Sequence, residues 1–323
     1  MSQAKPTYYL TVMLMLMHLA QTAQAQLTIT PEDPDTTFSH LYSTALRLKD
    51  EGQFQSAMNK AEQALQKTMT SEDNSKQLQA LELMGDIYHA SGRSAAGVPY
   101  YLRAAGLLEV SKDSMQLATL YPKIAEAYRA ERVFASELEY YEKTIDLLPG
   151  SSYDAILALQ VKSAEAAHHD GNHERAIEIL KIVLQSYPEG KSEWSKLQQD
   201  LIAGFDAAGN YDSALVYTSR LVPVYRDAGA IREVVKCVNN MGYYQTLLGD
   251  YRGASASYLE AVDRAETAGF SATEQAMMLS NAGICFTNMG REKEAVEQFT
   301  RALVLLEDAP AERARNENLL ANV

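Results

Sequence analysis

A motif that recurs about every 40 residues constrains the fold of this chain more than any other feature. In its clearest copy, Gly283 and Phe286 precede Gly290, and Ala295 and Phe299 follow it. With the central turn residue as the marker, seven copies lie at residues 52, 92, 132, 171, 209, 249 and 290. The marker is glycine in every copy except the third, which has arginine. Self-similarity in this register predicts a stack of similar small units rather than one globular core.

Within each copy the apolar residues lie three and four positions apart, which is the spacing of an amphipathic helix. Each period therefore predicts two antiparallel helices, and the glycine marker ends the first of them with a positive φ. Small residues fall where the two helix axes must approach closely, as at Gly85, Gly242 and Gly283. Because one such pair cannot bury its own apolar face, we expect the pairs to stack on one another.

This pattern resembles the tetratricopeptide repeat (TPR), in a form of about 40 residues rather than the common length of about 34. The resemblance implies an all-α fold, a right-handed α-solenoid of about seven helix-turn-helix TPR-like repeats. The predicted repeats span 38–309 and comprise residues 38–77, 78–117, 118–156, 157–194, 195–234, 235–275 and 276–309. Three copies depart from the pattern, at Glu137, Ile202 and Gln245, and we expect them to pack less regularly. Pro122 and Pro223 fall within predicted helices, which they should kink or whose ends they should shift.

Residues 1–25 have the pattern of a secretory signal peptide. Lys5 precedes an apolar run over residues 10–20, and Ala23 and Ala25 form a small-x-small cleavage signal. A run of that length is too short to cross a bilayer, which takes about 20 apolar residues. We therefore predict cleavage before Gln26, a short linker at 26–37, export to the periplasm or the extracellular space, and no membrane insertion of the mature chain.

Residues 310–323 repeat the pattern of a first helix. Asn322 follows Asn281 and Asn240 at the spacing of the repeats, each time next to apolar residues. We interpret this segment as the start of an eighth repeat that is truncated here, and the chain as a fragment of a longer protein.

The composition limits the chemistry of the chain. It carries a formal net charge of −13 and 46% hydrophobic residues, which is globular with an acidic balance. An acidic chain of this kind is not expected to bind nucleic acid. The sequence has no phosphate-binding loop, nucleophile elbow or dinucleotide fingerprint, so we expect neither an enzyme nor a cofactor.

Three local features each have two interpretations. The imidazoles between His168 and His173 have the residue type of a transition-metal site, but we favour simple packing of these rings at an inter-helix turn and no metal. Cys237 and Cys285 are predicted to be two buried thiols, because their repeat positions place them ~10 Å apart along the helix axes, too far for a disulfide. An exposed Trp194 would anchor a partner, but we expect it to pack at the entry of a first helix.

In TPR arrays the ligand groove is the concave surface, and particular first-helix positions line it. Carried over to this sequence, these positions are Tyr42, Leu46, Lys49, Glu82, Asp86, His89, Glu126, Arg129, Val161, Glu165, His168, Lys196, Gln199, Asp206, Lys236, Asn239, Tyr243, Ser280, Ile284 and Asn288. Acidic residues predominate in the first half, which would suit a basic or extended polar segment. A charged, solvated groove is also ordinary for this fold, and both interpretations stay open. No three consecutive copies supply the carboxylate clamp that some TPR proteins use.

The resemblance indicates a protein that binds a peptide or protein non-covalently on its concave surface. Long repeats behind a signal peptide resemble the extracytoplasmic sensing or docking regions of bacterial signalling proteins. The alternative is a freestanding periplasmic or secreted scaffold for an envelope complex. A transmembrane helix and an output domain beyond Val323 would favour the first interpretation, and a polar capping helix would favour the second.

Overall fold

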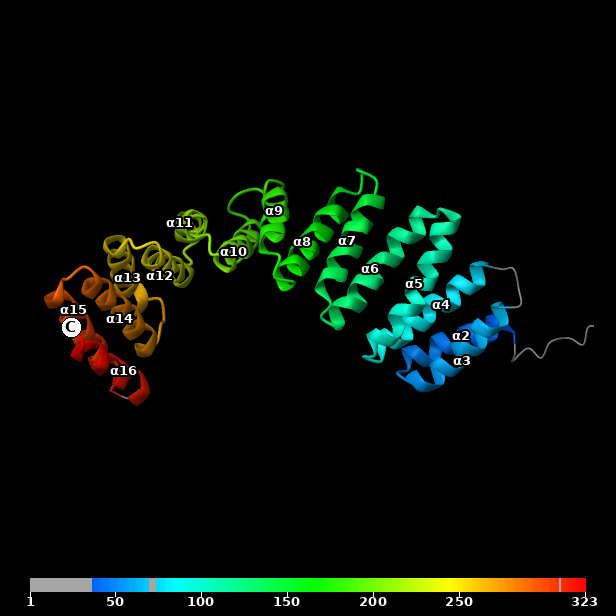
Figure 1. Ribbon diagram of the computed structural model, residues 1–323, viewed down its shortest axis with the longest axis horizontal. Coiled ribbons are helices and arrows are strands. Elements are labelled where there is room, and N and C mark those ends of the chain that lie inside the picture. Colours follow the sequence, from blue (N-terminus) through cyan, green and yellow to red (C-terminus); the bar gives the residue numbers. More distant parts are fainter. Residues whose placement is uncertain (1–36, 70–73, 308) are drawn as a thin grey trace, which may run out of the picture. The chain divides into compact units, whose positions relative to one another are not determined.

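The computed structural model describes residues 37–69, 74–307 and 309–323 (Figure 1). In those ranges the chain forms fifteen α-helices and no strand, and within each unit consecutive helices pack side by side. Residues up to Glu131 form one compact unit and residues from Arg132 onward form a second. The predicted signal peptide, and the predicted linker except for residue 37, lie outside the described residues.

The first unit holds two helical hairpins and the first helix of a third. Its helices are α2 (Phe38–Asp50), α3 (Phe54–Thr68), α4 (Asn74–Ala90), α5 (Ser94–Ser111) and α6 (Ser114–Ala130). Within this unit α2 packs on α3 and α4 packs on α5, and α4 also contacts α2 and α3 of the preceding repeat. This is the stacking that the repeat predicts.

The second unit continues the alternation of first and second helices. Its helices are α7 (Phe134–Leu147), α8 (Tyr153–His169), α9 (His173–Leu184), α10 (Ser192–Ala207), α11 (Tyr211–Asp227), α12 (Ile231–Leu247), α13 (Tyr251–Ala265), α14 (Ala272–Asn288), α15 (Glu292–Leu305) and α16 (Pro310–Ala321). The predicted all-α architecture of stacked hairpins, an α-solenoid, is therefore confirmed.

Several first helices begin before the predicted repeat boundaries. α4 begins at Asn74 rather than near residue 78, and α14 begins at Ala272 rather than near residue 276. The first turns of these helices consist mostly of exposed or half-exposed polar residues, which apolar periodicity does not detect. In α14 that turn is fixed by a capping box, in which Ser271 and Glu274 cap each other's backbone N–H groups.

The turn within each hairpin has the predicted backbone. All seven marker residues have a positive φ, between 59° at Arg132 and 83° at Gly171. At the last marker, the N–H of Gly290 donates to the carbonyl of Thr287 and the N–H of Arg291 to that of Phe286, both at 2.9 Å. These two bonds form the Schellman motif that ends a helix at a left-handed residue. Arg132 adopts the same conformation although it has a Cβ.

Glycines in the first helices allow an aromatic ring of the second helix to lie against the backbone. The ring of Tyr258 packs on Gly242, and the ring of Phe299 packs on Gly283. A Cβ at Gly283 would stand 2.6 Å from Cε1 of Phe299, which no real pair of carbons tolerates. The predicted close approach of the two helices is confirmed at these positions.

The sequence departures are accommodated within continuous helices. α6 and α11 continue past Pro122 and Pro223 for several residues. Ile202 is buried in the largest apolar cluster of the second unit. Where an aromatic residue is replaced by Gln245, its side-chain amide lies 2.7 Å from Ser257 Oγ, so that a polar pair joins α12 to α13.

The predictions for tryptophan and the two cysteines are confirmed. Trp194 is 7% exposed and packs into the core at the start of α10. Cys237 and Cys285 are both buried and free. Burial raises the pKa of the Cys237 thiol to about 11, which keeps it protonated and unreactive at neutral pH.

The last helix packs like the first helix of a further repeat. Leu319, Leu320 and Val323 lie against the cluster formed by Phe286 and Phe299. The remaining face of α16 is exposed and mostly polar. Among the described residues, no helix combines the length and the apolar character that a membrane crossing needs.

Candidate binding surface

In the first unit, the structure brings two predicted acidic residues together with a lysine that the sequence interpretation missed. The Nζ atom of Lys123 on α6 lies 3.3 Å from Glu82 Oε2 and 3.1 Å from Asp86 Oδ2, both on α4. The phenol of Tyr101 also donates to Asp86 Oδ1 at 2.7 Å. Lys123 therefore compensates much of the negative charge expected in this part of the groove.

Electrostatics at this cluster follow from its geometry. Burial lowers the pKa of Lys123, but the nearby carboxylates of Asp86 and Glu82 outweigh burial and raise it. The same two carboxylates affect the predicted residue Tyr42 on α2. Burial raises the pKa of the Tyr42 phenol, and the charges of Glu82 and Asp86 raise it further. The charges on α4 and α6 therefore also influence Tyr42 on α2.

The other predicted residues of the first unit do not belong to the cluster around Lys123. Lys49 pairs with Asp50 at 3.4 Å, and His89 Nδ1 lies 3.0 Å from Ser94 Oγ. Leu46 is exposed on α2. Glu126 and Arg129 are half-buried on α6.

In the second unit, predicted residues line a hollow of about 290 Å³ between α8, α9 and α10, which we name the α8–α10 hollow. The predicted residues Val161, Glu165 and His168 contribute to it from α8. Asp200 on α10 faces them and was not predicted. The remaining wall is largely apolar, formed by Ala164, Ala176, Leu180 and Ala203, with His169 at one side.

Asp200 is the unusual group of this hollow. Its side chain is half-buried, and it makes no hydrogen bond or ion pair with another described residue. Burial raises the pKa of Asp200 most strongly. The charge of Lys196 lowers this pKa, the charge of Glu165 raises it, and His168 lowers it by the smallest amount. A carboxylate held without a partner beside a second carboxylate would be stabilised by a cation.

The imidazole of His168 adds no positive charge at neutral pH. Burial lowers its pKa from the usual 6.5, and the neighbouring His173 and His169 lower it further. His168 Nδ1 lies 3.2 Å from His173 Nδ1, so one ring must donate and the other accept. As predicted, these rings pack at the turn between α8 and α9. In the described part of the chain, no three metal-ligating side chains converge.

Asp200 lies one position after Gln199, the residue predicted to line the groove on α10. The Nε2 atom of Gln199 donates to the hydroxyl of Tyr225 on α11 at 2.6 Å. Asp200 and Ala203 are three residues apart and therefore share a face of α10. An acidic residue followed at this spacing by a small one was the signal available in the sequence.

The remaining predicted residues of the second unit are spread over α10 to α14. Lys196 is exposed, and Lys236 pairs with Glu233 at 2.8 Å. Asp206 lies near two tyrosines: burial raises the pKa of Tyr243 and that of Tyr244, the latter to about 12, and the charge of Asp206 contributes to both.

Two polar residues that were carried over to the groove from α14 make contacts within the protein. Asn288 donates to the carbonyl of Ile284 on its own helix at 2.9 Å. Ser280 is buried and donates to Asn316 on α16, so it does not face a groove. Asn239 on α12 is half-buried.

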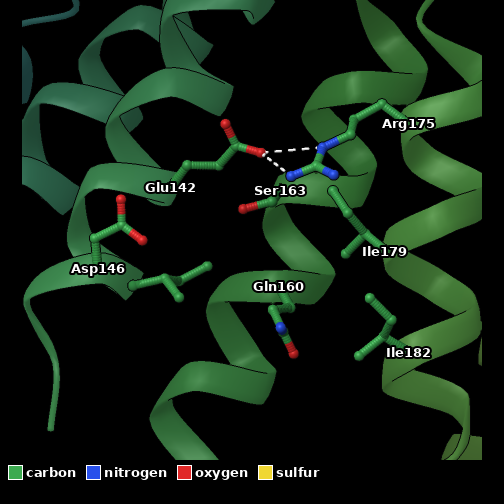
Figure 2. Close-up of a pocket in the computed structure, with 8 residues that line it drawn as sticks. Glu142, Asp146, Gln160, Ser163, Arg175, Ile179 and Ile182 are labelled. Carbon is green, nitrogen blue, oxygen red and sulfur yellow. Dashed lines mark hydrogen bonds and ion pairs between the residues drawn. The ribbon is translucent and has the colours of Figure 1, made fainter.

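A second hollow, of about 260 Å³, lies between α7, α8 and α9 (Figure 2). Figure 2 shows Glu142 facing Arg175 across it, with Oε1 accepting from Nε at 3.1 Å and from a terminal guanidinium nitrogen at 2.7 Å. Arg175 is also bound by Glu178 at 2.7 Å. The cation in this hollow is already paired, which distinguishes it from the α8–α10 hollow, where a carboxylate lacks a partner.

Comparisons with known proteins agree with this architecture. No family model and no curated protein matches the chain. Among solved structures, the apo form of RapI has a TM-score of 0.50 and 12% identity, over 84% of this chain and 77% of that one. The C-terminal part of a TPR repeat-containing protein from Cytophaga hutchinsonii has a TM-score of 0.49 and 16% identity, over 77% and 89%. YrrB, a TPR protein with an unusual peptide-binding site, has a TM-score of 0.44 and 15% identity, over 67% and 97%.

The likeness is one of fold, because every identity is low. It coincides with the helical hairpins, the positive-φ turns and the small-residue contacts of the structure itself. In the described residues the chain is therefore an all-α array of helical hairpins, and its similarity to the solved structures is a similarity of fold.

Proposed function

We propose that this protein is a non-enzymatic scaffold that binds a peptide or protein segment along its first helices, with a lysine or arginine side chain of the ligand in the α8–α10 hollow. The observation that carries the proposal is the half-buried carboxylate of Asp200, which has no partner among the described residues and lies in a hollow with Glu165. A cationic side chain would supply the missing partner.

The shape of the hollow suits such a side chain. Its walls at Ala164, Leu180 and Ala203 are apolar, and its charged groups are carboxylates. Lysine and arginine have an apolar stem and a charged end, so that the stem can lie on the wall while the end reaches Asp200. A hydrogen bond between charged groups in a partly buried site contributes about 1.5–3 kcal/mol, which corresponds to roughly a tenfold or greater change in affinity.

Peptide binding to the purified chain tests this proposal. A peptide set that differs only in one central residue, lysine, arginine, glutamine or norleucine, is titrated by calorimetry. We expect the lysine and arginine peptides to bind about tenfold tighter than the other two. Asp200→Asn should remove this preference, and Asp212→Asn, at an exposed position on α11, should leave it unchanged. Equal binding of all four peptides to the unaltered chain would contradict the proposal.

For the cellular role, we propose the exported sensing or docking region of a bacterial signalling protein. The signal-peptide pattern at residues 1–25 and the TPR-like fold support this proposal. The mature chain would work in the periplasm or outside the cell. Cell fractionation with an epitope at the C-terminus tests export: recovery of a full-length, uncleaved chain from the cytoplasm would contradict it.

A freestanding scaffold for an envelope complex is the second candidate. The array of stacked hairpins supports it equally, because solenoids of this kind present extended surfaces to their partners. The genomic sequence that follows the codon for Val323 separates the two candidates. A transmembrane segment and an output domain would support the signalling role, and a stop codon would support the scaffold.

A further inference from the structure

We propose that a second site, between α9, α10 and α11, binds a small organic anion that carries a carboxylate or phosphate, an N–H group and an apolar ring. The site is a hollow of about 520 Å³ that shares no residue with the α8–α10 hollow. It is lined by Lys181, Glu189, Trp194, Gln198, Tyr217 and Arg220, with Leu184 and Gln185. Its volume lies in the range of known small-molecule sites.

Two positive charges stand at this hollow without an acidic partner. Neither Lys181 nor Arg220 makes an ion pair with another described residue. In the same unit, Arg175, Lys236 and Arg291 are each paired with a glutamate. An anion bound at Lys181 and Arg220 would bring these two charges the partner that they lack.

Aromatic rings hold the two cations in place. Lys181 Nζ lies 5.1 Å from the ring centroid of Phe205, and Arg220 Cζ lies 4.7 Å from that of Tyr217. The two rings are themselves in contact, with centroids 5.2 Å apart. Cation–π contacts restrain both side chains without neutralising their charge, so the site is arranged before an anion arrives.

A buried amide indicates that the ligand also has an N–H group. Gln198 is fully buried, and its Nε2 donates to the backbone carbonyl of Tyr217 at 3.1 Å. This bond fixes the orientation of the amide and leaves Oε1 without a hydrogen-bond partner in the described part of the chain. Because buried acceptors in proteins are nearly always hydrogen-bonded, we infer that the N–H group of the ligand is the partner of this oxygen.

The remaining lining residues indicate which apolar group the ligand carries and which residue opposes its negative charge. Leu184, Trp194 and the ring of Tyr217 offer an apolar surface for a ring. The one acidic residue of the lining, Glu189, lies exposed in the connection between α9 and α10. Its charge opposes an anion, so Glu189→Gln should tighten binding of anionic ligands.

Trp194 provides the assay, because it is the only tryptophan of the chain and lines the hollow. The full chain is titrated with N-acetylphenylalanine, which has a carboxylate, an N–H group and a ring, and with the phosphate monoester of N-acetylphenylalaninol, which replaces the carboxylate by a phosphate and keeps the N–H group and the ring. We expect a saturable change in tryptophan fluorescence with at least one of them. The tighter of the two identifies carboxylate or phosphate as the preferred anion, and no saturable change with either would overturn the proposal.

Matched ligands and variants test each group. The uncharged N-acetylphenylalanine amide, and the ester analogue O-acetylphenyllactate, which lacks the N–H group, should each bind at least tenfold more weakly than N-acetylphenylalanine. Lys181→Gln combined with Arg220→Gln should weaken binding by at least tenfold, with folding checked by circular dichroism. Equal binding of the charged and uncharged ligands, or unchanged binding to the double variant, would overturn the proposal. Asp200→Asn should leave this binding unchanged. The proposal for this site can therefore be refuted without refuting peptide binding in the α8–α10 hollow.

Discussion

The ring of Phe299 on α15 lies directly on the backbone of Gly283 on α14, and it is almost completely buried there. Gly283→Ala should therefore destabilise the C-terminal repeats although alanine is the better helix former. The added Cβ would stand 2.6 Å from the ring, and overpacking of this kind costs about 1–3 kcal/mol. Hydrogen exchange of α14 and α15 and the midpoint of urea unfolding would measure the loss.

Gly106 on α5 is the matched control for this substitution. A Cβ at Gly106 would meet no atom within 4 Å. Gly106→Ala should stabilise the chain by up to about 1 kcal/mol, because glycine is a poor residue for a helix interior. If both substitutions changed stability in the same direction, close packing would not be the reason for glycine at position 283.

Arg132 occupies a turn position that favours glycine. Its φ of 59° lies in the left-handed region, where a residue with a Cβ loses roughly 1–2 kcal/mol. Arg132→Gly should stabilise the chain by about 1 kcal/mol, and the reverse change, Gly290→Arg, should destabilise it by a similar amount. Thermal unfolding of the two variants beside the unaltered chain measures both. A loss of stability in Arg132→Gly would show that the arginine side chain contributes more than the turn backbone.

These two positions also show why much of the fold follows from the sequence. Periodicity places the helices, and a turn residue such as Gly290 ends them, because both are local effects of backbone geometry. Arg132 could be recognised as the same turn only because the glycine markers before and after it lie about one repeat length away. The start of α4 at Asn74 does not follow from the sequence pattern, because the first turn of this helix contains polar residues and periodicity detects only apolar ones.

The candidate site was less predictable, because it depends on contacts between helices. Lys123 is recognisable as part of the groove only once α4 and α6 are placed side by side. The contact between Gln198 and the backbone of Tyr217 likewise joins two helices and leaves no pattern in the sequence. On α10 the residue predicted from the sequence is Gln199, whereas the residue that lines the α8–α10 hollow is its neighbour Asp200.

The ion pair between Lys123 and Asp86 should make a modest contribution to stability. Both side chains are partly exposed, so solvent screens their attraction, and pairs of this kind contribute up to about 1 kcal/mol. A double-mutant cycle with Lys123→Met and Asp86→Asn isolates the coupling free energy. A coupling of zero within error would show that the cluster does not stabilise the first unit.

Acid should weaken the region around His168. Burial and the adjacent histidines lower the pKa of His168 in the folded chain, so the unfolded chain binds the proton more readily. The stabilising contribution of the neutral imidazole is complete above pH 6.5, the usual pKa, and is lost as the pH falls through the lower pKa of the folded state. His168→Gln should reduce this pH dependence between about pH 7 and 5, as measured by denaturant unfolding at each pH. An unchanged dependence in the variant would assign it to other groups.

Site-specific photocrosslinking in intact cells tests most directly whether the first helices bind a polypeptide through a cation at Asp200. A photoreactive residue at position 203, in the α8–α10 hollow, is compared with one at position 216, which is exposed on α11. We predict a polypeptide adduct from position 203 only, with a lysine or arginine close to the attachment point in mass spectrometry, and its loss in Asp200→Asn. Adducts equally abundant from both positions, or an adduct at 203 that persists in Asp200→Asn, would contradict the claim.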